Sequence, residues 1–193
     1  MNICVYCSSS NAVKDLYFKA AEELGKLIGN RNHSLIFGGA NVGLMEHLAS
    51  TVKLYNGHIT GIIPLKIHNF QLTSDKANEI VITETMDERK ALMRDKSDAF
   101  IALPGGFGTL EEILEVITLK QLDYLRKPIV FININGYFND LLNQFEKSYS
   151  ETFAKESYRK IYKITSTPEE AILYIENYEH ELTDNKWFKV PVK

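Results

Sequence analysis

Short apolar runs rich in β-branched residues alternate along the chain with longer segments in which apolar residues recur every three or four positions. Runs this short are too brief for a helix, so each predicts a buried strand. The expected strands cover 2–7, 33–37, 58–63, 79–83, 99–103 and 128–132, and 158–165 could add a further one.

The longer segments have the spacing of amphipathic helices. They cover 16–28, 42–52, 89–98, 110–122 and 137–145. A capping-box pattern with proline at the first helical position, 167–170, predicts a last helix of about ten residues through Tyr178. Apolar strands that alternate with helices indicate a parallel sheet covered on both faces, so we expect a doubly wound, Rossmann-like α/β fold.

The chain has 193 residues, of which 45% are hydrophobic and 24% charged, as in one ordinary globular domain. We therefore expect a single domain over 1–193. The final segment, 179–193, has no clear periodicity and contains the only tryptophan, Trp187. It is interpreted as a C-terminal arm that packs on this subunit or on a neighbour.

The formal net charge is −3, and basic and acidic residues are interspersed without a basic block. A nucleic acid polymer is therefore not expected as a partner. No stretch approaches the roughly 18 apolar residues of a membrane span, and the N-terminus lacks the charged region and apolar core of a signal peptide. We expect a cytoplasmic protein without a membrane partner.

Cys4 and Cys7 form a CxxC pattern inside the first expected strand. Side chains three positions apart in a strand point to opposite faces, and a zinc site would need two further ligands. The five histidines show no metal-ligand spacing. We interpret both cysteines as reduced and packed, and no metal site is expected.

Glycines cluster after two of the expected strands, where ligands bind in doubly wound sheets. The first cluster, 38–43, runs into the helix at 42–52. A backbone without Cβ atoms can approach a ligand closely, and a helix N-terminus favours a phosphate. Glycine-rich turns of this kind are common, so 38–43 could equally be an ordinary turn.

The second cluster, Pro104 to Thr109, follows the strand at 99–103 and leads into the helix at 110–122. Its spacing matches neither dinucleotide-binding nor P-loop motifs. We expect it to hold one phosphate on the backbone amides of Gly105 to Thr109 and on the Thr109 hydroxyl, without a P-loop lysine or its magnesium.

Two carboxylates, Glu111 and Glu112, are expected in the first turn of that helix. Thr109 and Glu112 fit a capping box, which would make Glu112 a structural residue. A carboxylate beside a phosphate site could instead stabilise an oxocarbenium ion or orient water. Further upstream, Arg89 and Lys90 point about 100° apart on a helix, so at most one is expected to enter a given site.

Taken together, these segments resemble the LOG (Lonely Guy) family of cytokinin riboside 5′-monophosphate phosphoribohydrolases. The most specific elements are PGGxGTxxE, here Pro104 to Glu112, and the pair formed by Arg89 and Lys90. The resemblance implies that Arg89 and Glu112 are the catalytic pair, which reverses the preference for a cap. It also implies these substrate-binding residues: Ser8, Gly39, Met86, Lys90, Gly105, Gly106, Phe107, Gly108, Thr109, Glu111 and Thr118.

This chain departs from the family pattern at two positions near the expected ligand, where Ser8 and Glu46 replace glycines that are common in relatives. By resemblance, the expected reaction is hydrolysis of the N-glycosidic bond of a purine nucleoside 5′-monophosphate, without a metal or redox cofactor. The purine is adenine or an N6-substituted adenine. A homodimer is expected by the same resemblance and from the wide apolar face of 110–122.

Two other interpretations stay open on sequence alone. Relatives have been labelled lysine decarboxylases, but that chemistry requires a pyridoxal phosphate Schiff-base lysine, and no lysine has a suitable pocket context. A non-catalytic nucleotide-binding or carrier protein would share the fold and the phosphate loop. Retention of Arg89 and Glu112 argues against a carrier.

Overall fold

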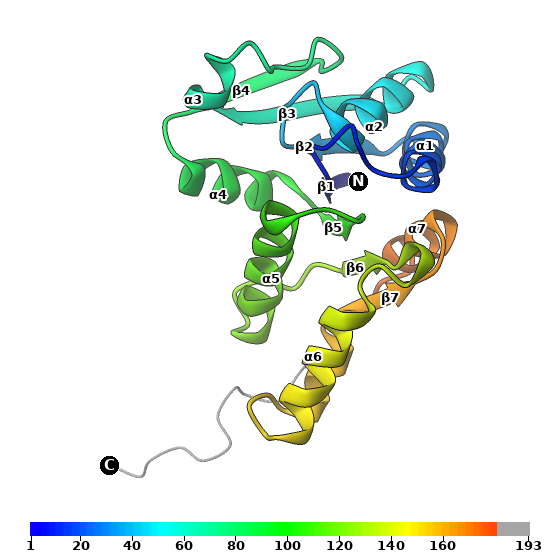
Figure 1. Cartoon of the computed structure of the whole chain (residues 1–193), viewed down its shortest axis with the longest axis vertical. Coiled ribbons are helices and arrows are strands. Elements are labelled where there is room, and N and C mark those ends of the chain that lie inside the picture. Colours follow the sequence, from blue (N-terminus) through cyan, green and yellow to red (C-terminus); the bar gives the residue numbers. More distant parts are fainter. Residues whose placement is uncertain (181–193) are drawn as a thin grey trace.

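The computed structural model describes residues 1–180 and contains one seven-stranded parallel sheet with the strand order β4-β3-β2-β1-β5-β6-β7 (Figure 1). The strands are β1 (Asn2–Tyr6), β2 (Ser34–Phe37), β3 (His58–Pro64), β4 (Glu79–Thr83), β5 (Ala99–Ala102), β6 (Ile129–Ile132) and β7 (Lys163–Thr165). The expected parallel, doubly wound fold is thereby confirmed. The expected arm, 179–193, falls almost wholly outside the described residues.

Helices connect these strands. They are α1 (Asp15–Asn30), α2 (Gly43–Leu54), α3 (Leu65–His68), α4 (Met86–Lys96), α5 (Phe107–Gln121), α6 (Asn139–Ser150) and α7 (Pro168–Glu176), with 3-10 turns at η1 (Ile134–Gly136) and η2 (Glu156–Lys160). The cap expected before α7 is present, because the Thr167 hydroxyl accepts a hydrogen bond from the Glu170 amide. Most of 158–165, considered for a strand, is η2 and loop, and only its last three residues pair with β6.

Alternate residues of β1, β2, β5 and β6 pack into two separate cores, one on each face of the sheet. Ile3 and Val5 of β1 join the core under α1, α2 and α7, whereas Cys4 and Tyr6 join the core under α4, α5 and α6. Cys7 belongs to the first core, so the two cysteines do lie on opposite faces, as expected.

The chain reverses direction across the sheet at β1. Successive strands run outward from β1 to β4, and the chain then returns to place β5 on the other side of β1. Such a reversal leaves a crevice beyond the carboxyl ends of the strands, where ligands bind in open α/β sheets. Both glycine clusters lie there, after β2 and after β5.

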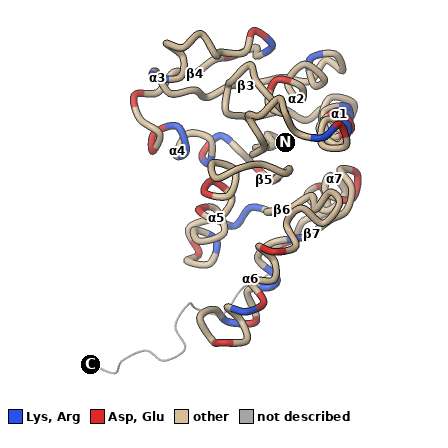
Figure 2. The backbone as a smooth tube through the Cα atoms, in the orientation of Figure 1, with Lys and Arg blue, Asp and Glu red and all other residues tan. Residues whose placement is uncertain are grey.

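Charges of both signs are scattered along the backbone (Figure 2). In residues 1–180, no helix combines the length and the apolar character that crossing a membrane would need.

Candidate functional site

Two adjoining cavities form one cleft at the carboxyl ends of the strands. The first, of about 340 Å³, is lined by Ser8, the α5 N-terminus and Glu112. The second, of about 500 Å³, lies towards β3 and α3. They share four lining residues: Ser9, Met45, Met86 and Arg89. The cleft therefore reaches from the second glycine cluster to the first, with Arg89 at the junction.

The helix after the second glycine cluster begins earlier than the sequence pattern predicts. It starts at Phe107, with Gly106 as N-cap and no side chain capping it. Thr109 is thus the third helical residue, and Glu111 and Glu112 lie in the second turn. The expected first-turn placement and the Thr109–Glu112 capping box are both wrong, because an N-cap must stand outside the helix.

Glu112 instead pairs with Arg89 from the neighbouring helix. The Arg89 Nη1 atom lies 2.6 Å from Glu112 Oε1, and its Nε donates to the backbone carbonyl of Ile62 on β3 at 2.9 Å. Both side chains are only about one-tenth exposed. Arg89 is therefore fixed from two sides and presents its guanidinium to the cleft that it lines.

Gly38 leaves the space that Arg89 needs. A Cβ atom at this position would overlap Arg89 Nη2. The first glycine cluster thus supports the Arg89–Glu112 pair sterically, from the end of β2. This role was not expected, since the sequence shows only that the position lacks a side chain.

Burial raises the pKa of Glu112 above its ordinary value of 4.5, although the Arg89 charge and hydrogen bond act in the opposite direction. Desolvation disfavours the carboxylate more than its partner stabilises it. A carboxylate held in this state is poorly solvated and responds strongly to a positive charge that develops nearby.

Lys90 points away from the pair, as the helical angle between neighbours predicts. Its Nζ lies 2.5 Å from Glu111 Oε1 and 3.7 Å from Glu115 Oε1. The hydrogen bond that Lys90 donates to Glu111 raises the pKa of Lys90. Lys90 therefore joins α4 to α5 at the edge of the cleft. Glu88, its near neighbour, completes a capping box with Thr85 at the start of α4.

At the start of α2, after the first glycine cluster, backbone amides already have acceptors within the chain. Asn11 Oδ1 accepts from the Gly43 amide and the Ser8 carbonyl accepts from the Leu44 amide, each at 2.9 Å. Glu46 turns away from the cleft to accept from the Ser74 hydroxyl at 2.5 Å. The Ser8 hydroxyl accepts from the Ser10 amide. Ser8 and Glu46, which replace glycines common in the family, thus both form hydrogen bonds within the chain.

Most of the residues selected by resemblance surround the cleft. The first cavity is lined by Ser8, Met86, Gly106, Phe107, Gly108, Thr109 and Glu111, together with the Arg89–Glu112 pair. Gly39 lies between two residues that line the second cavity. Thr118 stands apart, since it is exposed on α5 and donates to the Leu114 carbonyl. It lines neither cavity of the cleft.

Sequence reasoning missed the apolar lining of the second cavity. Side chains from α2, the end of β3 and the segment after it form this wall: Val42, Met45, Pro64, Ile67 and Leu72. Val42 belongs to the first glycine cluster, 38–43, whereas the other four carry no motif; only the position of 64–72 directly after a strand end could have marked Pro64, Ile67 and Leu72. The wall gives the cleft an apolar side opposite its polar glycine side.

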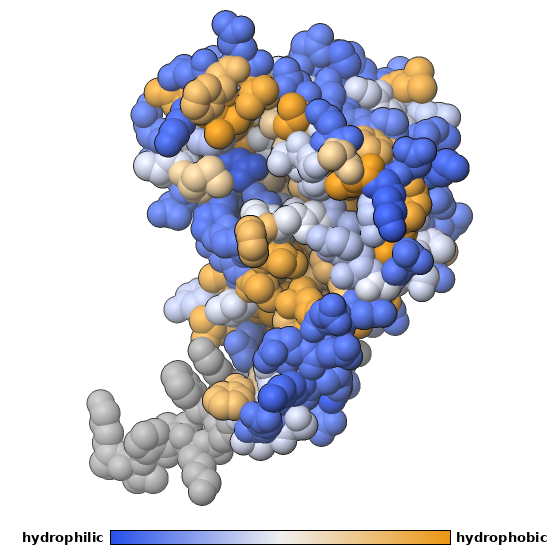
Figure 3. Space-filling model, in the orientation of Figure 1, coloured by the Kyte–Doolittle hydropathy of each residue, from blue (hydrophilic) through white to orange (hydrophobic). Residues whose placement is uncertain are grey.

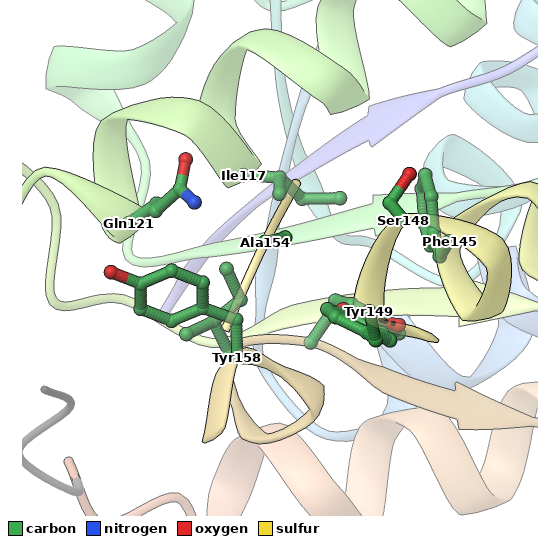
Figure 4. Close-up of a pocket in the computed structure, with 9 residues that line it drawn as sticks. Ile117, Gln121, Phe145, Ser148, Tyr149, Ala154 and Tyr158 are labelled. Carbon is green, nitrogen blue, oxygen red and sulfur yellow. Dashed lines mark hydrogen bonds between the residues drawn. The ribbon is translucent and has the colours of Figure 1, made fainter. Parts of the chain in front are cut away.

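A smaller cavity, of about 160 Å³, lies between α5 and α6 (Figure 4). Ile117 of α5 faces Phe145, Ser148 and Tyr149 of α6 across it, and Tyr158 closes one side. It lies ten residues along α5 from Phe107, or about 15 Å. Neither the paired carboxylate nor a helix N-terminus faces it, so the cleft at the strand ends is the better candidate site.

The parallel sheet and the reversal at β1 define a Rossmann-like protein, and the cleft at a glycine-flanked helix N-terminus lies at its switch point. Over 189 residues the chain is 41% identical to a probable cytokinin riboside 5′-monophosphate phosphoribohydrolase of Oryza sativa subsp. japonica, covering 96% of this chain and 78% of that protein. It is 40% identical to a cytokinin riboside 5′-monophosphate phosphoribohydrolase of Arabidopsis thaliana, covering 94% and 84%. The chain belongs to the LOG family.

Three further likenesses add to this. A family described as "Possible lysine decarboxylase" matches residues 45–175. Among solved structures, the molybdenum cofactor binding protein of Rippkaea orientalis is similar, with a TM-score of 0.71 and 27% identity over 91% of this chain and 94% of that one. The molybdenum cofactor carrier protein of Chlamydomonas reinhardtii has a TM-score of 0.68 at 19% identity and so shares the fold.

Proposed function

We propose that this chain hydrolyses the N-glycosidic bond of a purine nucleoside 5′-monophosphate and releases the free base and ribose 5-phosphate. The observation that carries the proposal is the buried Arg89–Glu112 pair, which lines a cleft together with an uncapped helix N-terminus. The family relatives at about 40% identity are named for this reaction on cytokinin riboside 5′-monophosphates.

The 5′-phosphate binds at the start of α5. The first amides of a helix have no partner within it and carry a partial positive charge. At this helix no side chain takes them, and a Cβ added at Gly106 or Gly108 would meet nothing within 4 Å. Phosphate oxygens are thus held by the amides of 106–109 and by the Thr109 hydroxyl.

Glu112 acts on the ribose. It lies one helical turn beyond Thr109, so a phosphate at the turn brings the sugar towards its carboxylate. As the base departs, positive charge develops on the sugar, and the poorly solvated carboxylate stabilises it and orients the attacking water. Arg89 positions Glu112 or the ribose hydroxyls, and Lys90 balances the charge of Glu111. These roles require no metal or redox cofactor.

The base occupies the apolar side of the cleft. A cavity of about 500 Å³ adjoins the pair through Arg89 and Met86, and its wall includes Ile67 and Leu72. Apolar lining of that size supports an adenine with an apolar N6 substituent, the cytokinin type, over unmodified adenine.

The active unit is a homodimer. Apolar side chains gather over α5 and between α5 and α6 (Figure 3), and Leu110, Leu114 and Ile117 are only partly buried within the chain. A second copy covering this face would bury them and would bring the exposed Thr118 into an interface. A cytoplasmic location stays a prediction from the sequence.

A molybdenum cofactor carrier is the second candidate, favoured by the structural likeness at 27% identity. The Arg89–Glu112 pair that lines the cleft favours hydrolysis over a carrier role, and the relatives at about 40% identity are named for hydrolysis. For lysine decarboxylation a cofactor-binding lysine is needed, and in residues 1–180 no lysine lines either cavity of the cleft.

The test is chromatographic detection of free base after incubation with AMP, adenosine, ATP and N6-isopentenyl AMP. We expect release from the two monophosphates only, with the prenylated one faster. Equal turnover of adenosine and AMP would exclude the phosphate role of 106–109. No base from any of the four, together with binding of a molybdenum cofactor, would favour the carrier.

A further inference from the structure

Tyr137 lies in the loop after β6, far in sequence from the glycine clusters. Asn135 and Gly136 adopt left-handed conformations, with φ of 51° and 71°. Asn133 Oδ1 accepts from the Phe138 amide at 2.8 Å, which closes the loop on itself. This tight loop fixes where the Tyr137 side chain leaves the backbone.

The Tyr137 ring reaches the second glycine cluster. Its hydroxyl donates to the backbone carbonyl of Gly105 at 2.6 Å. The ring packs edge-on against Tyr17 and Phe138, with centroid distances of 5.8 and 5.1 Å. The hydroxyl is therefore held in place by contacts that do not depend on a ligand.

That hydrogen bond controls the direction of a backbone amide. In a trans peptide, the carbonyl of Gly105 and the N–H of Gly106 point to opposite sides. A cavity of about 230 Å³, lined by Tyr137, Tyr17 and Gly105, lies beside this peptide, and Gly106 also lines the cleft. Fixing the carbonyl towards Tyr137 thus turns the amide the other way.

The peptide needs such a restraint. Gly105 can have no side chain, because a Cβ would overlap the Thr109 hydroxyl, and Gly106 follows directly. Two glycines in succession have the greatest backbone freedom of any pair. An ordered set of donors at this turn therefore depends on a contact from outside it.

We propose that Tyr137 is a positioning residue, whose hydroxyl orients the Gly105–Gly106 peptide so that the amides at the α5 N-terminus converge on the substrate phosphate. This inference rests on the proposed function for its substrate. It predicts an effect on ligands that carry a phosphate and none on the base alone.

The test compares Tyr137→Phe with a matched control, Tyr17→Phe, which removes a hydroxyl from the same small cavity without touching Gly105. Tyr137→Leu, which also removes the ring, separates the hydroxyl from packing. Binding of ribose 5-phosphate and of adenine is measured by calorimetry, KM and kcat with AMP, and folding by thermal unfolding.

For Tyr137→Phe we expect about tenfold weaker binding of ribose 5-phosphate, a KM for AMP raised by a similar factor, and unchanged adenine binding and unfolding temperature. Tyr137→Leu should weaken the binding of ribose 5-phosphate at least as much, and Tyr17→Phe should bind it as the parent does. Parental binding and KM in Tyr137→Phe, with a defect only in Tyr137→Leu, would overturn the inference and leave the hydrolase proposal standing. If the parent releases no base, but Tyr137→Phe still binds ribose 5-phosphate more weakly than the parent, the inference would stand and the hydrolase proposal would be refuted.

Discussion

The two glycine-rich turns lie on either side of β1 at the same edge of the sheet, yet they have different roles. After β2, the helix N-terminus is filled by Asn11 and by the Ser8 carbonyl. After β5, no side chain caps the helix, and the turn is held from behind by Tyr137. A glycine turn is open to a ligand only where the protein leaves its own donors unused.

The space around the glycines differs between the two turns in the same way. A Cβ at Gly43 would overlap the backbone of Ser9, and Gly43 has a φ of +61°. At Gly106 and Gly108, by contrast, a Cβ would meet nothing within 4 Å. Glycine is needed for protein packing at Gly43 of the first turn and at Gly105 of the second, whereas Gly106 and Gly108 leave space that the folded chain does not use.

The largest expected effect comes from the carboxylates that follow the two turns. Glu112→Gln should lower the rate of base release on the order of a hundredfold or more, roughly 3 kcal/mol, because the charge facing the developing cation is lost. The matched change Glu46→Gln, on the helix after the first turn, should leave the rate within about threefold. Base-release kinetics, AMP affinity and thermal unfolding are measured on the same preparations. A folded Glu112→Gln protein that binds AMP and works at the parental rate would refute the catalytic role.

Glycine substitutions are expected to give the next largest effects, one on KM for AMP at the second turn and one on stability at the first. Gly108→Ala should raise KM for AMP about tenfold without loss of stability, because alanine fits the helix and only the ligand loses space. Gly43→Ala should instead destabilise the fold by about 2 kcal/mol or more, through left-handed strain and backbone overlap. Denaturant unfolding and steady-state kinetics distinguish the two. If Gly108→Ala binds AMP normally, the phosphate does not lie at the second turn.

The sequence sufficed for most of the sheet because the strands from β1 to β6 contain short, largely apolar runs, whereas β7 (Lys163–Thr165) is short and mostly exposed. The sequence failed at the start of α5, where Phe107 and Gly108 have weak helical preference and were assigned to the loop. The helix nevertheless begins at Phe107, and Thr109 and Glu112 are buried within it. Three Thr-x-x-Glu patterns, beginning at Thr85, Thr109 and Thr167, look alike in sequence.

The first and third of those patterns cap helices, whereas the second does not. Its glutamate is taken by Arg89, 23 residues away. A local pattern cannot reveal such a partner, because the contact depends on how α4 and α5 pack on the sheet. Resemblance to the family identified the two residues, and the fold explains why they meet. Tyr137 left no signal in the sequence at all.

The pH dependence of stability provides a separate test of the burial of Glu112, the carboxylate after the second turn. The folded-state pKa of Glu112 is raised above 4.5 by burial, so the folded protein keeps this proton where the unfolded chain has lost it. The stability from this group is complete below pH 4.5 and is lost as pH rises through the folded value. Glutamine cannot ionise, so the unfolding temperature of Glu112→Gln relative to the parent should rise as the pH is raised above 4.5 and through the folded-state pKa of Glu112. A difference that stays constant over this range would contradict the raised pKa.

The smallest expected effect concerns Asn11, which supplies the acceptor at the first turn. Asn11→Ala removes the hydrogen bond to the Gly43 amide, and the loss of such a capping bond costs about 1 kcal/mol. The residue is exposed, so water can replace the lost acceptor in part. Denaturant unfolding should therefore show a modest loss, while KM and kcat for AMP stay within about threefold of the parent, because the first turn supports the cleft without holding the phosphate. Asn11→Asp, which keeps an acceptor at the helix N-terminus, should restore the stability. If Asn11→Ala instead raises KM for AMP as strongly as Gly108→Ala, then the first turn also contacts the ligand and the division between the two turns is wrong.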